Sequence, residues 1–284
     1  MAVFFNQATL TYNGGTANSN IVSGEIVEVI TAAKTATPSS YRAGDVITYI
    51  VTLTNSSAVA VNGLTVTDDL GAYTQGGLNL VPLDYIDGTA RYFAGGILQA
   101  DPTVNDGPPL VISGINVPAG DNAVIVYQAR ANAFAPLGTE SGITNTVSVT
   151  GAGIVNPITA SATINSTDGA ELSITKSVSP STVSENGQLT YTFVIENRGN
   201  TDAVATDNLV VSDTFNPILS NLTVSLDGTA LVLGTDYTYN ETTGEFETTQ
   251  SRITVPAATY TQDPTTGAIT VTPGSATLTV SGTI

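Results

Sequence analysis

The amino-acid sequence predicts an all-β protein built from two tandem β-sandwiches, with an N-terminal arm before them. Apolar and polar residues alternate with a period of two along residues 46–53, and the same alternation returns along 189–195. Turn-forming pairs such as Asn13-Gly14 and Asp227-Gly228 separate the alternating runs. No stretch keeps a period of 3.6 residues over three turns, so we expect short strands and regular turns rather than helices.

Two copies of one repeat make up most of the chain. Its two lysines, Lys34 and Lys176, stand at the same place in KTATPSSYRAGDVITYIVTLTNS and KSVSPSTVSENGQLTYTFVIENR, where the spacing to Pro, Tyr and Asn is identical. A repeat of this length indicates two related domains rather than one large one. Further matched segments are LTVTDDL (64–70) with LVVSDTF (209–215), VIVYQA (124–129) with ATLTVSG (276–282), and the two DGTA runs (87–90 and 227–230).

The repeat is out of phase with the chain. The first predicted domain, 30–167, ends in ITNTVSVTGAGIVNPITASATI, two strands around a turn, whereas the second, 172–284, stops before such a pair. The predicted arm, 1–29, carries FNQATLTYNGGTANSNIVSGEIVEV, which matches that pair in order, length and pattern and aligns Asn6 with Asn145. The chain is therefore expected to begin with the end of a domain and to finish with an incomplete one.

An incomplete sandwich exposes a strand edge and a strip of core. The arm could return to its own second domain, but its second strand runs almost directly into Ile30, which leaves little linker for that path. Insertion into a neighbouring molecule needs no linker and gives a head-to-tail contact that propagates into a fibre. A plain alternative is a short edge hairpin on the first domain. The starting Met and the phase of the repeats favour insertion over a spacer cut from a longer protein.

Composition excludes several classes of function. The formal charge of −17 makes nucleic acid and anionic membranes unexpected partners. The absence of Cys, His and Trp removes disulfides, histidine catalysis and most transition-metal sites, and no apolar run is long enough to span a membrane. Acidic loops around Asp101, Asp106 and Asp121 lack calcium-loop spacing, so no metal or other cofactor is expected. The N-terminus, MAVFFNQATLTYN, does not read as a secretory signal, and the export route stays open.

Strand parity places three polar side chains on the core side of each copy. Lys34, Asp68 and Asn145 form the first set, and Asp69, beside Asp68, points outward by the same parity. A buried ammonium group requires a carboxylate partner. A desolvated lysine loses its proton more readily, and the neutral amine can attack the Asn carboxamide while the Asp polarises the carbonyl and moves protons. Ammonia leaves and a Lys–Asn isopeptide bond remains.

The second set is Lys176, Asp213 and Asn6. Asn6 belongs to the arm, on the face that it shares with Ala8, Leu10 and Tyr12, so these four residues are the expected donor strand. If a neighbour supplies the arm, the bond would join two molecules. The alternatives are a hydrogen-bonded cluster without a bond, or lysines that reach the domain edge.

Two other asparagines compete as acceptors. Asn55 and Asn197 lie at strand ends beside turn-forming residues, so a turn role is expected for both.

The repeat resembles the conserved repeat domain of bacterial envelope proteins, the domain of unknown function numbered eleven. The motifs SITKSVSPSTVSENGQLTYTFVIENRGN, LTVTDDL and ITNTVSV carry this resemblance over nearly all of the chain. The polar residues are also similar to those of self-crosslinking, collagen-adhesin-type domains. The resemblance implies Ig-like sandwiches with the Lys on the first strand, the Asp on a middle strand and the Asn on the last.

These features together predict a structural subunit of an extracellular bacterial filament. Its expected partner is itself, in a head-to-tail homopolymer on a cell or spore surface, with no assignment for the anchor. Asp68 and Asp213 would act once each, so no turnover enzyme is expected. The alternative is a monomeric adhesin or stalk module, with binding loops between Thr74 and Pro109.

Overall fold

The computed structural model describes residues 2–151 and 153–284, so the first residue of the predicted arm lies outside the described part. Strands dominate this part, and its one helical turn is the 3₁₀ helix η1 (Ala205–Asp207). The chain divides into two compact units, residues 1–135 with 142–165, and residues 136–141 with 166–284. The protein is therefore all-β, as the alternation predicts. None of the described helical segments is long and apolar enough to cross a membrane.

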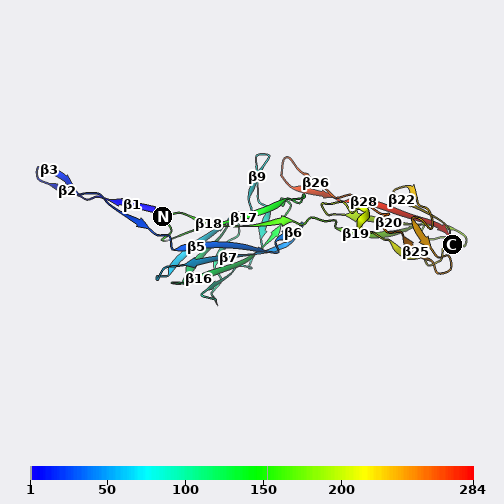
Figure 1. Cartoon of the computed structure of the whole chain (residues 1–284), viewed down its shortest axis with the longest axis horizontal. Helices are drawn as coiled ribbons and strands as arrows, with labels where there is room; N and C mark the ends of the chain where they lie inside the picture. Colours follow the sequence, from blue (N-terminus) through cyan, green and yellow to red (C-terminus); the bar gives the residue numbers. More distant parts are fainter. Residues whose placement is uncertain (1, 152) are drawn as a thin grey trace. The chain divides into compact units, whose positions relative to one another are not determined.

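A long hairpin forms the N-terminal arm (Figure 1). Its base pairs β1 (Ala2–Asn6) with β4 (Val22–Ile26), and its tip pairs β2 (Thr9–Tyr12) with β3 (Gly15–Asn18). Asn6 lies opposite Val22 in the base. The hairpin belongs to the first compact unit, and its predicted insertion into a neighbour stays a proposal.

Two six-stranded sheets make the sandwich of the first unit. One has the order β13-β12-β16-β7-β5 with β11 also on β16, and the other has the order β14-β15-β8-β17-β18-β6. Their alternating buried residues meet in a core that includes the fully buried Tyr49 and Tyr127. The bounds are β5 Ile30–Thr37, β6 Ser40–Tyr41, β7 Val46–Asn55, β8 Val61–Asp68, β11 Leu83–Tyr85, β12 Arg91–Ala94, β13 Ile97–Leu98, β14 Thr103–Asn105, β15 Leu110–Val117, β16 Asn122–Ala131, β17 Gly142–Thr150 and β18 Ile158–Ser166, with a separate hairpin of β9 Tyr73–Gln75 and β10 Leu78–Leu80.

The second unit repeats this plan with fewer strands. Its larger sheet has the order β19-β20-β28-β22-β23, and its smaller sheet has the order β21-β25-β24. Phe215 and Phe246 are fully buried in its core. The bounds are β19 Leu172–Ser179, β20 Gln188–Asn197, β21 Ser212–Thr214, β22 Ser220–Leu226, β23 Thr229–Ala230, β24 Tyr237–Tyr239, β25 Glu245–Thr248 and β28 Gly274–Thr283, with a hairpin of β26 Thr259–Gln262 and β27 Ile269–Thr272.

Strand pairing confirms the repeat around the lysines. Lys34 lies opposite Val51 in the β5–β7 ladder, and Lys176 lies opposite Phe193 in the β19–β20 ladder, at the same register in both copies. One matched segment differs, because the first copy has the strand β8 where the second has only the short β21. Within the described residues, β8 is paired on both sides, by β15 and β17, whereas β21 is paired only by β25. A strand with one ladder partner has half the backbone hydrogen bonds to hold it extended.

Candidate functional site

The first copy brings Lys34 and Asp68 together between its two sheets. Lys34 comes from β5 and Asp68 from β8, and Lys34 Nζ donates a hydrogen bond to Asp68 Oδ2 at 2.7 Å. The side chains are 0% and 1% exposed. The predicted core positions of both residues are therefore confirmed, and the ion pair or neutral pair that they form is shielded from water.

Asp68 is held from three directions. Its Oδ2 accepts hydrogen bonds from Lys34 and from the Tyr127 hydroxyl on β16, and its Oδ1 accepts one from the Leu70 backbone N–H at 2.7 Å. Asp69 faces away and accepts from the backbone N–H groups of Thr146 and Gly71, as its parity predicts. The carboxyl group next to the lysine is thus fixed in one orientation.

Asn145 completes this cluster. It lies on β17, two residues from Val147, which is directly opposite Asp68, so Asn145 and Asp68 are diagonal neighbours on one face. Asn145 is fully buried, yet neither its Oδ1 nor its Nδ2 makes a hydrogen bond to any described residue. An unsatisfied buried amide is costly and rare in folded proteins, and a catalytic role is one of the recognised explanations for it.

Two tyrosines form the wall of the cluster. Lys34 Nζ lies 4.8 Å from the ring centre of Tyr49 and 6.0 Å from that of Tyr127, and the two rings stack with centres 5.6 Å apart. Burial raises the pKa of both tyrosines, and the nearby Asn145 amide partly opposes the rise. The phenols therefore stay protonated, and Tyr127 remains a hydrogen-bond donor to Asp68.

Burial also lowers the pKa of Lys34, while the charge of Asp68 and its hydrogen bond oppose that shift. Desolvation thus favours the neutral amine, which is the nucleophilic form. The sequence indicated the lysine, the carboxylate and the amide, but the two tyrosines were not among the predicted site residues. Tyr49 and Tyr127 lie opposite each other on adjacent strands, a relationship that only the folded structure shows.

The second copy repeats the lysine and carboxylate contact in a more open setting. Lys176 Nζ donates to Asp213 Oδ2 and lies 4.6 Å from the ring centre of Tyr191. The Lys176 side chain is 42% exposed and that of Asp213 18%. Val280 lies opposite Tyr191, where the first copy has Tyr127 opposite Tyr49, so Asp213 has no matching phenol.

The structure does not place an asparagine at this second pair. The described hydrogen bonds of Asp213 come from Lys176 and from the Thr214 backbone N–H. Asn6 is exposed on β1 in the first unit, where it lies opposite Val22. Its predicted role at Lys176 therefore stays a proposal about two molecules.

The rival asparagines have the turn role that the sequence predicts. Asn55 Nδ2 donates to the Val59 carbonyl at 2.8 Å, and its Oδ1 accepts from the Ser57 backbone N–H. Asn197 Nδ2 donates to the Thr201 carbonyl, and its Oδ1 accepts from the Gly199 backbone N–H. Both amides are occupied by loop backbone and are not free to meet a lysine.

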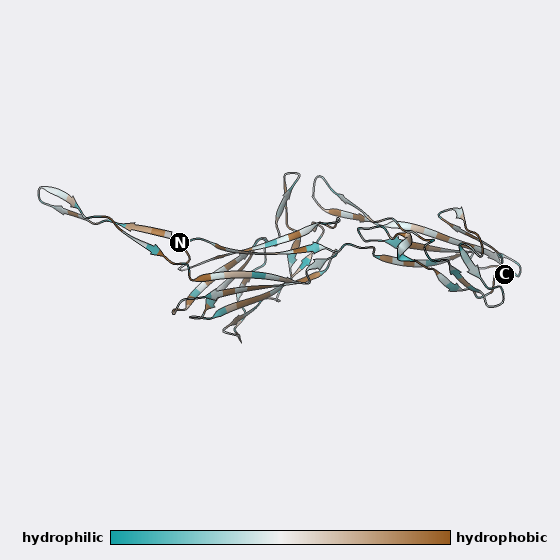
Figure 2. Ribbon diagram, in the orientation of Figure 1, coloured by the Kyte–Doolittle hydropathy of each residue, from teal (hydrophilic) through white to brown (hydrophobic). Residues whose placement is uncertain are grey.

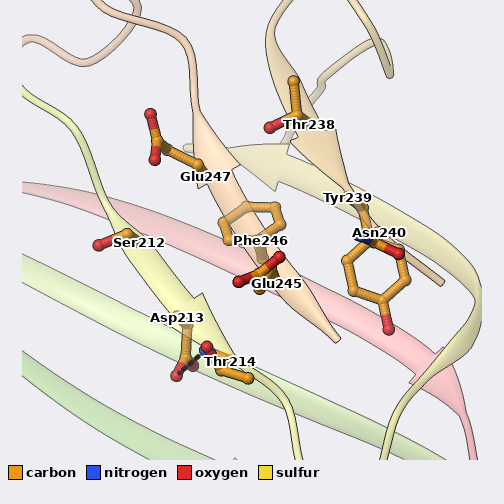
Figure 3. Close-up of a pocket in the computed structure, with 9 residues that line it drawn as sticks. All are labelled: Ser212, Asp213, Thr214, Thr238, Tyr239, Asn240, Glu245, Phe246 and Glu247. Carbon is orange, nitrogen blue, oxygen red and sulfur yellow. Dashed lines mark hydrogen bonds between the residues drawn. The ribbon is translucent and has the colours of Figure 1, made fainter. Parts of the chain in front are cut away.

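The face of β19 and the edge of β21 are open. Leu172 is 41% exposed, whereas its counterpart Ile30 is 4% exposed. A cavity of about 350 Å³ lies between the two strands, lined by residues that include Ile174, Lys176, Val211 and Asp213. A larger hollow of about 650 Å³ borders β21, β24 and β25, and Figure 3 shows Asp213 and Thr214 at its β21 side.

Apolar side chains of the arm are exposed as well. Figure 2 shows β1 as a hydrophobic strand in the hairpin. Phe5 is 70% exposed, Leu10 66% and Tyr12 59%, and the described part of the chain offers them no core. An exposed apolar hairpin of this kind is typical of a segment that binds a partner.

Searches against known proteins give structural neighbours only. No family model matches the chain, and no curated protein matches it. Among solved structures, the chain is similar to the pilus backbone RrgB of Streptococcus pneumoniae (TM-score 0.35, 14% identity, covering 86% of this chain and 55% of that one). It is also similar to the full-length major pilin SpaD of Corynebacterium diphtheriae (0.35, 15%, 58% and 41%) and to the collagen-binding domain of a Staphylococcus aureus adhesin (0.31, 10%, 49% and 97%).

The chain spans about half the length of the two pilin proteins or less. These structural neighbours are surface proteins of the pilin and adhesin type. TM-scores of this size do not establish a shared function, so the function below is proposed from the geometry of the chain itself.

Proposed function

We propose that this protein is the structural subunit of an extracellular filament that polymerises head to tail by strand insertion and is stabilised by Lys–Asn isopeptide bonds. The observation that carries the proposal is a difference between the two copies. In the first copy β17 covers the edge of β8, and in the second the matching edge of β21 is unpaired among the described residues. The arm, a free hairpin of the β17–β18 pattern, has the shape and polarity to fill that place in a neighbour.

Strand insertion would bury two exposed surfaces at once, the open edge of the second unit and the apolar side chains of the arm. The acceptor loses an open edge and an uncovered apolar face, while the donor buries the side chains of Phe4, Leu10 and their neighbours on the same face. The contact joins different surfaces of two identical molecules, so it repeats along a line unless the line closes into a ring. A filament is the expected product.

The bond within the first copy would form by proton transfer, nucleophilic attack and loss of ammonia. Lys34 gives a proton to Asp68, and the neutral Nζ attacks the Asn145 side-chain carbonyl carbon. Asp68 then donates a hydrogen bond to the carbonyl oxygen, passes its proton to the leaving nitrogen and takes up the second proton that Nζ loses when it becomes an amide N–H, so Asp68 ends protonated. The Nζ–Cγ bond forms, the Cγ–Nδ2 bond breaks and ammonia leaves. No oxidant or cofactor is needed.

The same chemistry in the second copy would use Lys176 and Asp213 of one molecule and Asn6 of the next. That bond would convert a strand-swapped filament into a covalent chain. Its formation would make the filament resistant to heat, denaturant and protease, because subunits could no longer separate by withdrawal of the arm.

Light scattering and negative-stain electron microscopy test the proposal. We expect filaments from the full chain and none from a variant that lacks residues 1–29. The matched control is Ile97→Asp, which changes an equally exposed apolar residue outside the arm and should leave assembly unchanged. A monomeric full chain would refute the proposal and favour a monomeric adhesin. Equal assembly by the deletion variant would refute strand insertion by the arm.

A further inference from the structure

The unpaired edge of β21 and the exposed face of β19 form an acceptor surface. Comparison with the first copy predicts which arm residue lies opposite each residue of β21. Resting on the proposed filament, we propose that a second copy inserts its arm beside β21 in one register, with Ala8 opposite Asp213 and Thr9 opposite Ser212. In this register the insertion covers the half-exposed Lys176–Asp213 pair and brings Asn6 to it. The first copy supplies the template for each step.

The acceptor side is fixed by the carboxylate. In the first copy, Val147 of β17 lies opposite Asp68, and Ser148 lies opposite Thr67. Asp68 and Asp213 hold equivalent positions, because each accepts a hydrogen bond from its lysine and lies opposite an apolar residue, Leu110 or Phe246, on the neighbouring strand. The strand that fills the edge of β21 must therefore place its counterpart of Val147 opposite Asp213.

The donor side is fixed by the hairpin. Asn145 lies opposite Ala162 in the β17–β18 ladder, and Asn6 lies opposite Val22 in the β1–β4 ladder. Residues 146–161 separate the first pair and residues 7–21 the second, so the two hairpins are of nearly equal length. Aligning the two asparagines makes Ala8 the counterpart of Val147 and Thr9 that of Ser148.

The side chains of the arm suit this register. The face that carries Asn6 also carries Phe4, and Phe4 lies over Gly24, which has no side chain to obstruct it. Between the pairs Asn6–Val22 and Thr9–Asn18, the return strand has one residue more than the outgoing strand. Ser19 donates its backbone N–H to the Ala8 carbonyl, so the extra residue lies at Asn20 and Ile21. Gln7 and Ala8 separate β1 from β2 in the free arm. The proposed register takes residues 4–10 as one extended strand in the docked arm, which puts Ala8 and Leu10 on the face of Asn6.

Insertion in this register supplies what the second site lacks. The counterparts of its open residues are covered in the first copy, where Lys34 is fully buried. Covering Lys176 and Asp213 would remove them from water at the moment when Asn6 arrives. The Lys176–Asn6 bond would thus form only after a neighbour's arm has docked, and free subunits would not form it.

Cysteine pairs test the register, because the natural chain has no cysteine. The full-length chain would carry Thr9→Cys with Ser212→Cys, in an Asn6→Ala background in which any covalent link between copies is a disulfide. The matched controls combine Thr9→Cys with Thr214→Cys, and Thr11→Cys with Ser212→Cys, each two residues out of register. Products are compared on non-reducing and reducing SDS gels, with light scattering on the same samples.

We expect a ladder from the first pair that collapses on reduction and forms roughly tenfold faster than any product of the controls, since disulfides tolerate little displacement. A faster ladder from a control pair would overturn the register and leave the filament intact. A closed monomer without free thiols would show that the arm enters its own chain. Filaments without any disulfide would overturn the docking surface, and the absence of both filaments and disulfides would refute the proposed function as well.

Discussion

Lys34 and Asp68 meet between the two sheets of the first unit, with Nζ and Oδ2 2.7 Å apart and both side chains buried. Lys176 and Asp213 make the same contact in the second unit, but the lysine side chain there is 42% exposed. One chemical pair thus occurs in two states of burial within one chain. The difference follows from β17, which covers the first pair and has no counterpart in the described part of the second unit.

The first prediction concerns the mass of the wild-type monomer or of any soluble fraction. If Lys34 joins Asn145, the chain is lighter than its sequence by one ammonia, and Asn145→Ala restores the mass calculated for that variant. The crosslink also closes a long loop, so its loss should lower the unfolding free energy of the first unit by about 4 kcal/mol. Intact mass spectrometry and thermal unfolding measure the two effects. A wild-type chain of unmodified mass would leave Lys34 and Asn145 as buried polar residues only.

The second prediction concerns links between subunits. Boiling the filaments in SDS should leave a ladder on a gel, and either Lys176→Ala or Asn6→Ala should remove it. Lys34→Met is the matched control, because it removes the other lysine and should leave the ladder in place. If the ladder disappeared only in the Lys34→Met variant, the bond between subunits would be formed by Lys34 and not by Lys176.

The third prediction concerns Tyr127. Tyr127→Phe removes the hydroxyl that donates to Asp68, and we expect bond formation in the first unit to slow by roughly tenfold, the effect of losing one hydrogen bond to a charged group. The rate is followed as ammonia loss by mass spectrometry after refolding of protein that has been kept unfolded in denaturant since its synthesis, so that no bond has formed beforehand. Tyr92→Phe serves as the control, since its hydroxyl donates to the Asn116 carbonyl away from the lysine. Equal rates in the two variants would show that Tyr127 only fills space.

The fourth prediction concerns pH and uses the Asn145→Ala variant, in which Lys34 stays buried without a bond. Burial lowers the pKa of Lys34 in the folded state below its ordinary 10.5. At pH values between the lowered pKa of the folded state and the ordinary pKa of the unfolded state, the unfolded chain binds more protons than the folded chain. The free energy of unfolding should therefore rise with pH in that range, by at most about 1.4 kcal/mol per pH unit. Denaturant unfolding between about pH 6 and 9.5 avoids the ordinary titration ranges of carboxylates and tyrosines.

The control for this pH dependence is the double variant Lys34→Met with Asn145→Ala. It removes the titrating amine, so the slope over the same range should disappear. A slope of the same size in both variants would assign the effect to other groups.

The sequence by itself determined the strands, the repeat and the polar residues of the first site. Period-two alternation specifies which side chains face a core, whatever that core contains, so the burial of Lys34, Asp68 and Asn145 followed from parity alone. Turn chemistry likewise identified Asn55 and Asn197 as loop residues, because their amides bond to backbone nearby in the chain.

Only the tertiary structure decided which groups touch across the sheets. Tyr127 reaches Asp68 from a strand that is distant in sequence, and β21 is much shorter than β8 although the two segments match in sequence. Alternation in one strand carries no information about its neighbours, whereas hydrogen bonds and desolvation depend on all of them. For the same reason, the two lysines look alike in the sequence and differ in the fold, since burial is a property of the completed sandwich.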